Sequence, residues 1–272
     1  MTRIAAVIGS PVTHSLSPVM HNAVFHESGL DWEFTRFDVT PDRVPAALAA
    51  MPVLGIGGFA VTMPNKEAAA AAVDEIDPAA RALDSVNTVV LRDDGTTFGA
   101  STDGAGLVAW LDASGVSVAG ERVVVLGAGA AGRSIVDALG RSGADEIVIV
   151  NRTAATAERA ASLAPCARVG GADDITDAQI VINATSIGMG TEQLPCDPAA
   201  LHEGQIVADI VYHPLDTALL RAARVVGAQA VDGLGMLVHQ AVLQQELWTG
   251  RRPDPAIMRT AAEHELATRR TP

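Results

Sequence analysis

Residues 122–153 read RVVVLGAGAAGRSIVDALGRSGADEIVIVNRT, with a glycine-rich turn between two apolar runs. Arg122–Leu126 is short and rich in β-branched residues, which predicts a strand, and Glu146–Val150 predicts a second one. The glycine turn at 127–132 opens a predicted helix that extends to about Ser142. Strand, glycine turn, helix and strand in this order are typical of a dinucleotide-binding βαβ unit. The stretch therefore predicts an oxidoreductase that uses a nicotinamide cofactor.

The three glycines of the turn each have a physical reason to be there. Gly127 permits the tight turn, Gly129 lets the backbone approach a pyrophosphate, and Gly132 lets the helix lie close to the strand. The start of the helix then offers free N–H groups and the positive end of its dipole to phosphates. A glycine-rich string alone is weak evidence, and the flanking strands are what make it specific.

The end of the second strand bears on the choice of cofactor. An acidic residue there binds the ribose hydroxyls of NAD, whereas arginine suits the 2′-phosphate of NADP. This chain has Asn151-Arg152-Thr153 and no carboxylate at that point. A guanidinium matches a phosphate well, although Arg152 could also be a solvated residue at a strand end. The presence of Arg152 and the absence of an acidic residue at this position together favour NADP over NAD.

The rest of the chain alternates strand-like and helix-like segments, which is typical of an α/β protein. Residues 88–91 and 97–99 flank Asp93-Asp94-Gly95 and predict a hairpin. Further strands are expected at 4–8, 34–39, 55–62, 180–183, 206–209 and 228–231. We predict an N-terminal α/β substrate-binding domain over 1–104, completed by two helices within 235–272 that break at 252–255. Residues 105–234 are expected to form a Rossmann domain with a doubly wound parallel sheet.

Composition excludes several classes of protein. Of the 272 residues, 49% are apolar and 19% charged, and the net charge is −13, so nucleic acids and anionic membrane surfaces are not expected partners. Cys166 and Cys196 fit no disulfide framework. Neither a signal-peptide pattern nor a bilayer-length apolar run is present, so we expect a cytosolic protein. The seven histidines show no metal-ligand spacing, and no metal is predicted.

Several polar residues of the first domain are candidates for catalysis or binding. Lys66 falls in the first turn of a helix that Pro64 is suited to begin, where a cation opposes the helix dipole. Such a local cost often marks a functional residue. The alternative interpretation of Lys66 is a solvated surface lysine. Asp103 precedes a helix expected near Leu107, and taken by itself it is interpreted as a helix cap. Taken by themselves, Asn87 and Ser15 are interpreted as turn residues, and Ser17 as the cap of a helix that begins at Pro18.

These motifs follow one another in a recognisable order. The series comprises His14–Pro18, Val61–Lys66, Val86–Thr88, Thr102–Gly104, the glycine turn, Asn151–Thr153, Asn183–Met189, Tyr212–Pro214 and Asp232–Gln240. It resembles the shikimate dehydrogenase family across essentially the whole chain. The resemblance implies that NADP oxidises the 3-hydroxyl of shikimate, with reduction of 3-dehydroshikimate as the physiological direction in aromatic amino-acid biosynthesis.

The resemblance also implies roles for individual residues. Lys66 and Asp103 correspond to the catalytic pair, in which Lys66 passes the hydroxyl proton and Asp103 orients it. The substrate side corresponds to Ser15, Ser17, Thr62, Asn87, Tyr212 and Gln240. The cofactor side corresponds to Gly127, Ala128, Gly129, Ala130, Ala131, Asn151, Arg152 and Thr153, with Thr185, Met189 and Gly235 nearer the nicotinamide.

The sequence departs from the family pattern at Ala60 and Ser101, where asparagine is usual, and at Thr156, where a second phosphate-binding arginine is frequent. Alternative functions are a quinate/shikimate or aminoshikimate dehydrogenase using NAD or NADP, and a non-catalytic sensor that binds NADP and a metabolite. A folate-pathway dehydrogenase would leave the motifs around Ser15 and Asp103 unexplained. The protein is expected to be a monomer or a homodimer.

Overall fold

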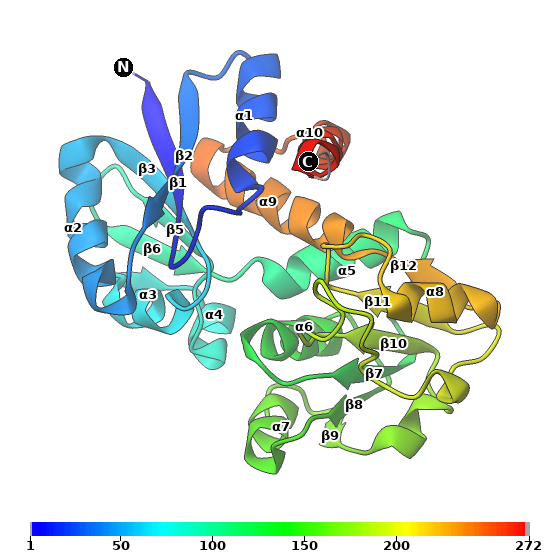
Figure 1. Cartoon of the computed structure of the whole chain (residues 1–272). Helices are drawn as coiled ribbons and strands as arrows, with labels where there is room; N and C mark the ends of the chain where they lie inside the picture. Colours follow the sequence, from blue (N-terminus) through cyan, green and yellow to red (C-terminus); the bar gives the residue numbers. More distant parts are fainter. Residues whose placement is uncertain (1, 270–272) are drawn as a thin grey trace. The chain divides into compact units, whose positions relative to one another are not determined.

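The computed structural model describes residues 2–269 and divides into two compact units (Figure 1). The first unit runs to Thr102 and resumes at Val238, and the second spans Asp103–Leu237. We expected the divisions after residue 104 and before residue 235. With these bounds Lys66 belongs to the first unit and Asp103 begins the second.

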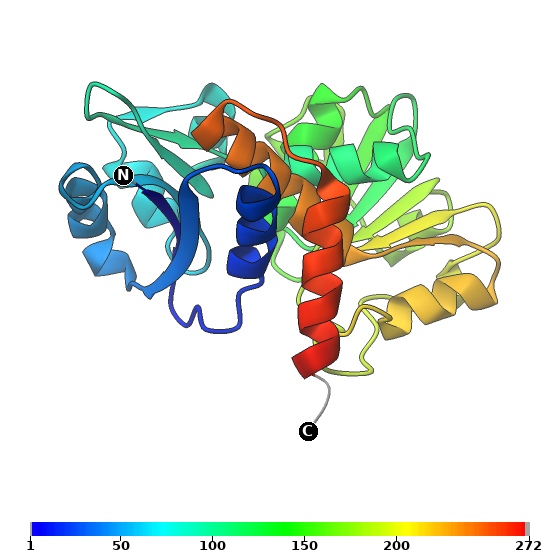
Figure 2. The same cartoon turned by 90° about the horizontal axis from the view of Figure 1, so that it is seen from above.

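The first unit is built on a six-stranded sheet of order β2-β1-β3-β5-β6-β4. Strand β1 runs parallel to β2 and β3, whereas β5 is antiparallel to β3 and to β6. Helices α1 and α10 lie side by side (Figure 2). The elements are β1 (Arg3–Gly9), α1 (Ser17–Glu27), β2 (Trp32–Asp38), η1 (Pro41–Arg43), α2 (Val44–Leu54), β3 (Ile56–Val61), α3 (Lys66–Ala72), β4 (Glu75–Ile76), α4 (Pro78–Leu83), β5 (Thr88–Leu91), β6 (Thr97–Ala100), most of α9 (Gly233–Thr249) and α10 (Pro255–Arg269).

The central strand β3 is buried along its whole length because apolar cores cover both faces of the sheet. Phe59 and Val61 belong to a core that α2 closes, while Ala60 belongs to a core with Trp248 of α9. A Cβ atom at Gly58 would lie 2.2 Å from the indole nitrogen of Trp248. That nitrogen instead donates a hydrogen bond to the Val89 carbonyl at 3.0 Å. The missing side chain at Gly58 therefore lets α9 lie directly on the sheet.

A buried histidine lies among the aromatic residues of this second core. His21 is fully buried, and its ring stacks on Phe34 with centroids 4.4 Å apart. Its Nδ1 lies 3.0 Å from Oε1 of Gln245. Burial lowers the pKa of His21 from 6.5 to about 4, against the raising effect of the glutamine contacts. The imidazole is therefore neutral in the folded protein at neutral pH.

His21 is expected to make the protein acid-sensitive. The pKa of His21 is lower in the folded protein than in the unfolded chain. The stabilisation that depends on its neutral form is therefore fully present above pH 6.5 and is lost as pH falls toward about 4. Linkage gives a loss of about 2 kcal/mol in the free energy of unfolding by about pH 5. In urea denaturation, the free energy of unfolding of His21→Gln should fall less between pH 6.5 and 4 than that of the wild type. His26→Gln, which changes an exposed histidine, is the control and should behave like the wild type. Equal acid sensitivity in His21→Gln and the wild type would contradict this.

The second unit has a six-stranded sheet of order β12-β11-β10-β7-β8-β9, and every neighbouring pair is parallel. Counted from β7, this is the doubly wound Rossmann order. The expected fold class is therefore confirmed. The elements are α5 (Asp103–Ala113), β7 (Arg122–Leu126), α6 (Ala130–Arg141), β8 (Glu146–Val150), α7 (Ala154–Ala161), β9 (Ala167–Val169), η2 (Ala172–Ile175), β10 (Ile180–Asn183), η3 (Pro198–Ala200), β11 (Ile206–Asp209), α8 (Ala218–Val225), β12 (Gln229–Val231) and the start of α9.

Alternate residues of β7 enter opposite cores. Val123 and Val125 pack with residues of α5 and α6, while Val124 packs with Leu219 of α8 on the other face. Burial on both faces explains why the strands of this unit read as continuous apolar runs. Among the described residues, no helix is both long and apolar enough to cross a membrane.

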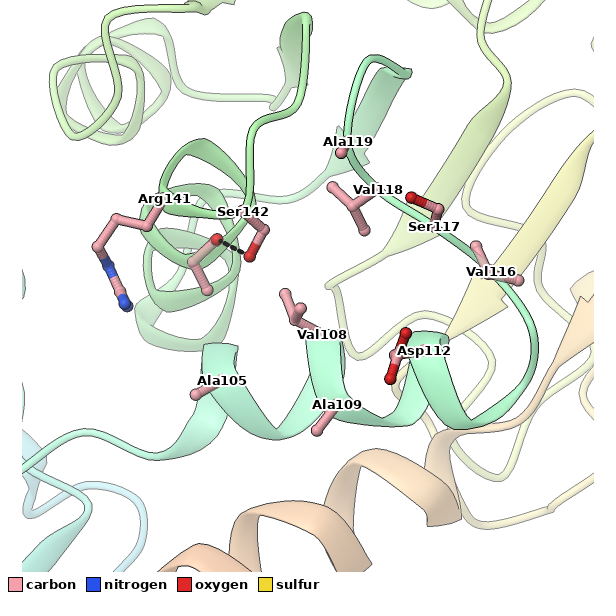
Figure 3. Close-up of a pocket in the computed structure, with 11 residues that line it drawn as sticks. Ala105, Val108, Ala109, Asp112, Val116, Ser117, Val118, Ala119, Arg141 and Ser142 are labelled. Atoms are coloured by element: carbon pink, nitrogen blue, oxygen red, sulfur yellow. Dashed lines mark hydrogen bonds between the residues drawn. The ribbon is translucent and has the colours of Figure 1, made fainter.

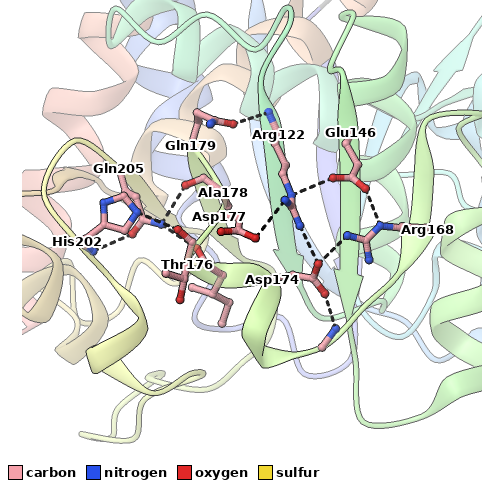
Figure 4. A network of polar contacts seen from close by, with 12 residues as sticks. Arg122, Glu146, Arg168, Asp174, Thr176, Asp177, Ala178, Gln179, His202 and Gln205 are labelled. Carbon is pink, nitrogen blue, oxygen red and sulfur yellow. Dashed lines mark hydrogen bonds and ion pairs between the residues drawn. The ribbon is translucent and has the colours of Figure 1, made fainter.

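Ion pairs tie together the amino ends of β7 and β8 (Figure 4). Arg122 contacts Glu146 at 2.9 Å and Asp174 at 2.8 Å, and Arg168 contacts the same two carboxylates at 2.5 and 2.6 Å. The bond from Arg168 is the main cause that lowers the pKa of Asp174 to about 2. In parallel α/β sheets ligands bind at the carboxyl ends of the strands, so we interpret this network at the amino ends as structural.

Three predicted helix starts were wrong. Helix α1 begins at Ser17 itself, and its cap position is Leu16 without a side-chain cap. Pro64 precedes α3, which begins at Lys66. Helix α5 begins at Asp103 rather than near Leu107, because the Gly104 N–H donates to Ser134 Oγ of α6 at 2.8 Å and so holds the first turn.

Candidate active site

In the first unit, three of the predicted site residues, Thr62, Lys66 and Asn87, lie at the same end of the sheet. Ser15 follows β1, and Thr62 and Lys66 follow its parallel neighbour β3. Asn87 immediately precedes β5, which is antiparallel to β3, so the start of β5 lies where β3 ends. The Val61 N–H donates to the Asn87 carbonyl at 2.7 Å. Strand direction alone therefore brings these segments together.

The segments after β1 and β3 lie in direct contact. The Thr62 N–H donates to the Ile8 carbonyl at 2.9 Å, and the Ser10 N–H donates to the Met63 carbonyl at 3.2 Å. A Cβ atom at Gly9 would lie 2.4 Å from Thr62 Cγ2, so only glycine allows this approach. Farther along the same segment, Ser15 Oγ accepts from the Ser17 N–H at 3.2 Å. Ser17 is thus held by Ser15 and does not act as a cap.

Asn87 is the centre of a buried polar network, not a simple turn residue. Its Oδ1 accepts from the Thr102 N–H at 2.8 Å, and its Nδ2 donates to Thr102 Oγ1 at 2.9 Å and to Gln240 Oε1 at 3.4 Å. One helical turn after Gln240, Gln244 Nε2 donates to the Asn87 carbonyl at 3.1 Å. These bonds fix the amide of Asn87 against α9.

Sequence reasoning assigned no role to Thr102 or Gln244. Gln244 could have been found, because residues i and i+4 share one face of a helix and Gln240 was already a candidate. Thr102 carried no such signal, since its pairing with Asn87 spans 15 residues and depends on the sheet.

Lys66 is the first residue of α3 and is half-buried. Its carbonyl accepts from the Val86 N–H at 3.1 Å, which ties the start of α3 to the segment that carries Asn87. Lys66 is also the only lysine in the chain, and the other residues of the Lys and Arg total are all arginines. Arginine stays protonated at physiological pH, whereas a lysine can release its proton. The one side chain of this kind therefore lies among the predicted substrate residues, a signal that sequence reasoning overlooked.

In the second unit, the glycine turn has the backbone that its expected roles require. Gly127 has φ of +103°, and a Cβ atom there would lie 2.7 Å from Thr185 Cγ2. A Cβ atom at Gly132 would lie 2.3 Å from the Gly127 carbonyl oxygen. Nothing lies within 4 Å of the Cβ position at Gly129, and α6 begins at Ala130 without a side-chain cap. Open space beside uncapped N–H groups fits a pyrophosphate.

Asn151 links the glycine turn to the residues that follow β8. Its Oδ1 accepts from the Ala128 N–H at 3.3 Å, and its Nδ2 donates to the Thr153 carbonyl at 3.0 Å. Arg152 is exposed, and Thr153 precedes α7 without capping it. Arg152 thus stands beside the glycine turn within the same unit, as a 2′-phosphate contact requires.

The remaining predicted residues of the second unit lie on several elements. Met189 is 53% exposed in the loop after β10, and Tyr212, the only tyrosine of the chain, is half-buried after β11. Gly235 lies against the ring of Trp110, which a Cβ atom would approach within 2.0 Å. Asp103 is buried at the start of α5.

A surface hollow of about 380 Å³ also lies in this unit, between α5, the end of α6 and residues 116–119 (Figure 3). Val108, Asp112, Val118 and Ser142 are among its lining residues. None of the predicted site residues lines it, so we assign it no part in catalysis.

Comparison with known proteins places the chain in a family. Three family models match it: the shikimate dehydrogenase substrate binding domain over residues 7–89, shikimate/quinate 5-dehydrogenase over 111–188, and the shikimate 5′-dehydrogenase C-terminal domain over 233–263. A shikimate dehydrogenase (NADP(+)) of Symbiobacterium thermophilum is 42% identical, covering 96% of this chain and 93% of the relative. The chain belongs to the shikimate dehydrogenase family. The resemblance noted in the sequence is therefore confirmed.

Solved structures of the family agree in fold. Shikimate 5-dehydrogenase of Thermus thermophilus, in complex with NADP(H) and shikimate, has a TM-score of 0.89 at 35% identity and covers 96% of this chain and 99% of its own. Quinate dehydrogenase of Corynebacterium glutamicum, in complex with NAD, has a TM-score of 0.90 at 30% identity and covers 97% and 99%. Fold similarity alone does not separate the two activities, so the choice depends on the residues of this chain.

Proposed function

We propose that this chain is an NADP-dependent shikimate dehydrogenase that reversibly reduces 3-dehydroshikimate to shikimate. The observation that carries the proposal is that the only lysine, Lys66, lies at the same end of the sheet as Thr62 and Asn87. Hydroxyl and amide groups at this edge suit a polyhydroxylated ring, because each unmatched polar group of a ligand is costly there. The oligomeric state, predicted to be a monomer or a homodimer, stays a prediction. The cytosolic location stays a prediction as well.

The chemistry assigned to this chain is proton transfer and binding. A carbinol carbon gives up a hydride only if its hydroxyl proton is also removed, and Lys66 is the group we assign to move that proton. In the reverse direction its ammonium form donates to the carbonyl oxygen. The pairing of Lys66 with Asp103 stays a prediction. NADP⁺, when bound, supplies the hydride acceptor, and Gly127–Ala131, Asn151, Arg152 and Thr153 would hold it.

A steady-state comparison of substrates and cofactors tests the proposal. Purified protein should oxidise shikimate with NADP at the highest kcat/KM among shikimate, quinate and aminoshikimate, each assayed with NAD and NADP. A higher kcat/KM for quinate with NAD would favour the alternative activity. Absence of turnover with all three substrates would overturn the enzymatic proposal in favour of a sensor.

Two departures from the family pattern leave the substrate range open. Ala60 offers only a methyl group beside Thr88 of β5, where the family often has asparagine, and Ser101 differs in the same way. The substrate range is therefore the part of the proposal that the comparison of substrates tests most directly.

Arg152→Ala is expected to reduce the preference for NADP. A charge-assisted bond to the 2′-phosphate would be lost, so KM for NADP should rise about 10- to 100-fold while KM for NAD changes little. Arg159, exposed on α7 of the same unit, provides the matched control Arg159→Ala. An equal rise in KM for both cofactors would mean that Arg152 does not contact the 2′-phosphate.

A further inference from the structure

Asp209 ends β11 as a buried carboxylate held by three neutral donors. Its side chain is 2% exposed. Its Oδ1 accepts from Asn183 Nδ2 at 2.9 Å and from the Val211 N–H at 3.0 Å, and its Oδ2 accepts from the Thr217 hydroxyl at 2.7 Å. Burial raises the pKa of Asp209, against the lowering effect of these donors. A buried carboxylate without a cation among its donors is costly, so a fold that retains one needs a reason for it.

Asn183 connects Asp209 to the loop that follows β10. The two residues are register partners on adjacent parallel strands. Asn183 Oδ1 accepts from both the N–H and the hydroxyl of Thr185, at 3.1 and 2.7 Å, and its Nδ2 also donates to the Ile187 carbonyl at 3.1 Å. Thr185 Oγ1 in turn accepts from the Ile187 N–H at 3.0 Å. The amide of Asn183 thus fixes the first half of the 184–190 loop.

The other two donors fix a second loop, residues 210–217, which contains Tyr212. The Val211 N–H holds the start of this loop on Asp209, and the Thr217 hydroxyl holds its end. The two loops also meet directly, since the Gly190 N–H donates to the His213 carbonyl at 3.1 Å. One carboxylate therefore anchors both loops.

These loops lie at the point where the order of the strands reverses. β10 pairs with β7, and Asn183 is opposite Leu126, the residue before the glycine turn. Thr185 lies against Gly127, where a side chain would clash with it. Doubly wound sheets bind their ligands at this crevice. A shift of the 184–190 loop would therefore change the surroundings of the glycine turn.

We propose that Asp209 is a positioning residue for the reaction. Through Asn183 and Thr217 it holds Thr185 and Met189 for the nicotinamide end of the cofactor and Tyr212 for the substrate. Catalysis depends on groups that are fixed before the substrate arrives, which gives the fold a reason to keep the buried carboxylate. The inference rests on the proposed function, because the roles of Thr185, Met189 and Tyr212 come from it.

Paired variants separate positioning from general stability. Thr217→Val keeps the side-chain shape but removes the hydroxyl, which donates to Asp209 and also accepts from the Leu220 N–H at the start of α8, and Thr217→Ser keeps both bonds. Asp209→Ala removes all three bonds, and Asp216→Asn alters an exposed carboxylate nearby as the matched control. Each variant is assayed for kcat with shikimate, for affinity for NADPH, and for affinity for 2′,5′-ADP, which lacks the nicotinamide. Fluorotyrosine labelling gives one fluorine resonance, from Tyr212.

In Thr217→Val, kcat and NADPH affinity should fall about tenfold, and further in Asp209→Ala, while 2′,5′-ADP affinity stays within about twofold. Thr217→Ser should restore values near the wild type, and the Tyr212 resonance should shift only in the impaired variants. Equal losses for NADPH and 2′,5′-ADP, or a Thr217→Ser variant as impaired as Thr217→Val, overturn the proposal. If Asp209→Ala does not fold, the Thr217 pair decides. Wild-type protein that binds NADPH but does not oxidise shikimate contradicts the proposed function instead.

Discussion

Lys66→Ala should lower kcat for shikimate oxidation by about 10³-fold, because no other side chain of its kind exists in the chain to move the hydroxyl proton. Lys66→Arg should be nearly as inactive, since a guanidinium keeps the charge but does not release a proton near neutral pH. The affinity for NADPH should stay close to the wild-type value, because Lys66 is not among the residues proposed to hold the cofactor, which are Gly127–Ala131, Asn151, Arg152 and Thr153.

Two controls make the Lys66 prediction specific. Glu67→Gln changes the charge at the next position of α3, where the side chain is exposed, and should keep kcat within about twofold. Circular dichroism and thermal unfolding should show that both Lys66 variants are folded. Because Lys66 is the only lysine, selective isotope labelling of lysine would report its titration in a single resonance. A Lys66→Arg variant with wild-type kcat would exclude Lys66 as the proton-transfer group.

Gly129→Ala should raise KM for NADP about 10- to 100-fold while leaving thermal stability unchanged. The structure has open space at the Cβ position of Gly129, so the added methyl group meets no protein atom within 4 Å. It would instead occupy the space through which a pyrophosphate approaches the backbone. Isothermal titration with NADP and thermal unfolding would separate these two effects.

Two other glycine substitutions provide the contrast for Gly129. Gly171→Ala is the matched control, since Gly171 also has nothing within 4 Å of its Cβ position but lies outside the turn, at the start of η2. Gly132→Ala should lower thermal stability as well as affinity, because its methyl group would lie 2.3 Å from the Gly127 carbonyl oxygen. Unchanged NADP affinity in Gly129→Ala would mean that the turn does not hold the pyrophosphate.

The predicted strands and the actual ones agree closely in the second unit. Residues 122–126, 146–150, 180–183 and 206–209 are strands with the bounds expected from the sequence. Their apolar runs are local signals, because burial on both faces of a sheet imposes them residue by residue. The short strands β4 and β9 carry too few residues to produce such a signal, and neither was predicted.

The candidate site was predicted less evenly. Motif order identified Lys66, Asn87 and Gln240, and the turn glycines followed from their backbone requirements. Thr102 was missed because its contact with Asn87 joins residues 15 positions apart, whereas the spacing of Gln244 from Gln240 was a signal that went unused. Asn183 begins the motif Asn183–Met189, and Asp209 shortly precedes the motif that starts at Tyr212, yet no local feature of β10 or β11 indicates that the two side chains meet.

The sequence was therefore sufficient for the dinucleotide-binding unit, the preference for NADP over NAD as a prediction, and the family. Those conclusions depend on glycine conformation and strand periodicity, which act over a few tens of residues or less, and on the order of motifs along the chain, which requires no tertiary contact to read. The start of α5, the network around Asn87 and the anchoring of two loops by Asp209 came only from the folded chain. They depend on hydrogen bonds between distant segments, and such bonds exist only once strand order and direction have brought those segments side by side.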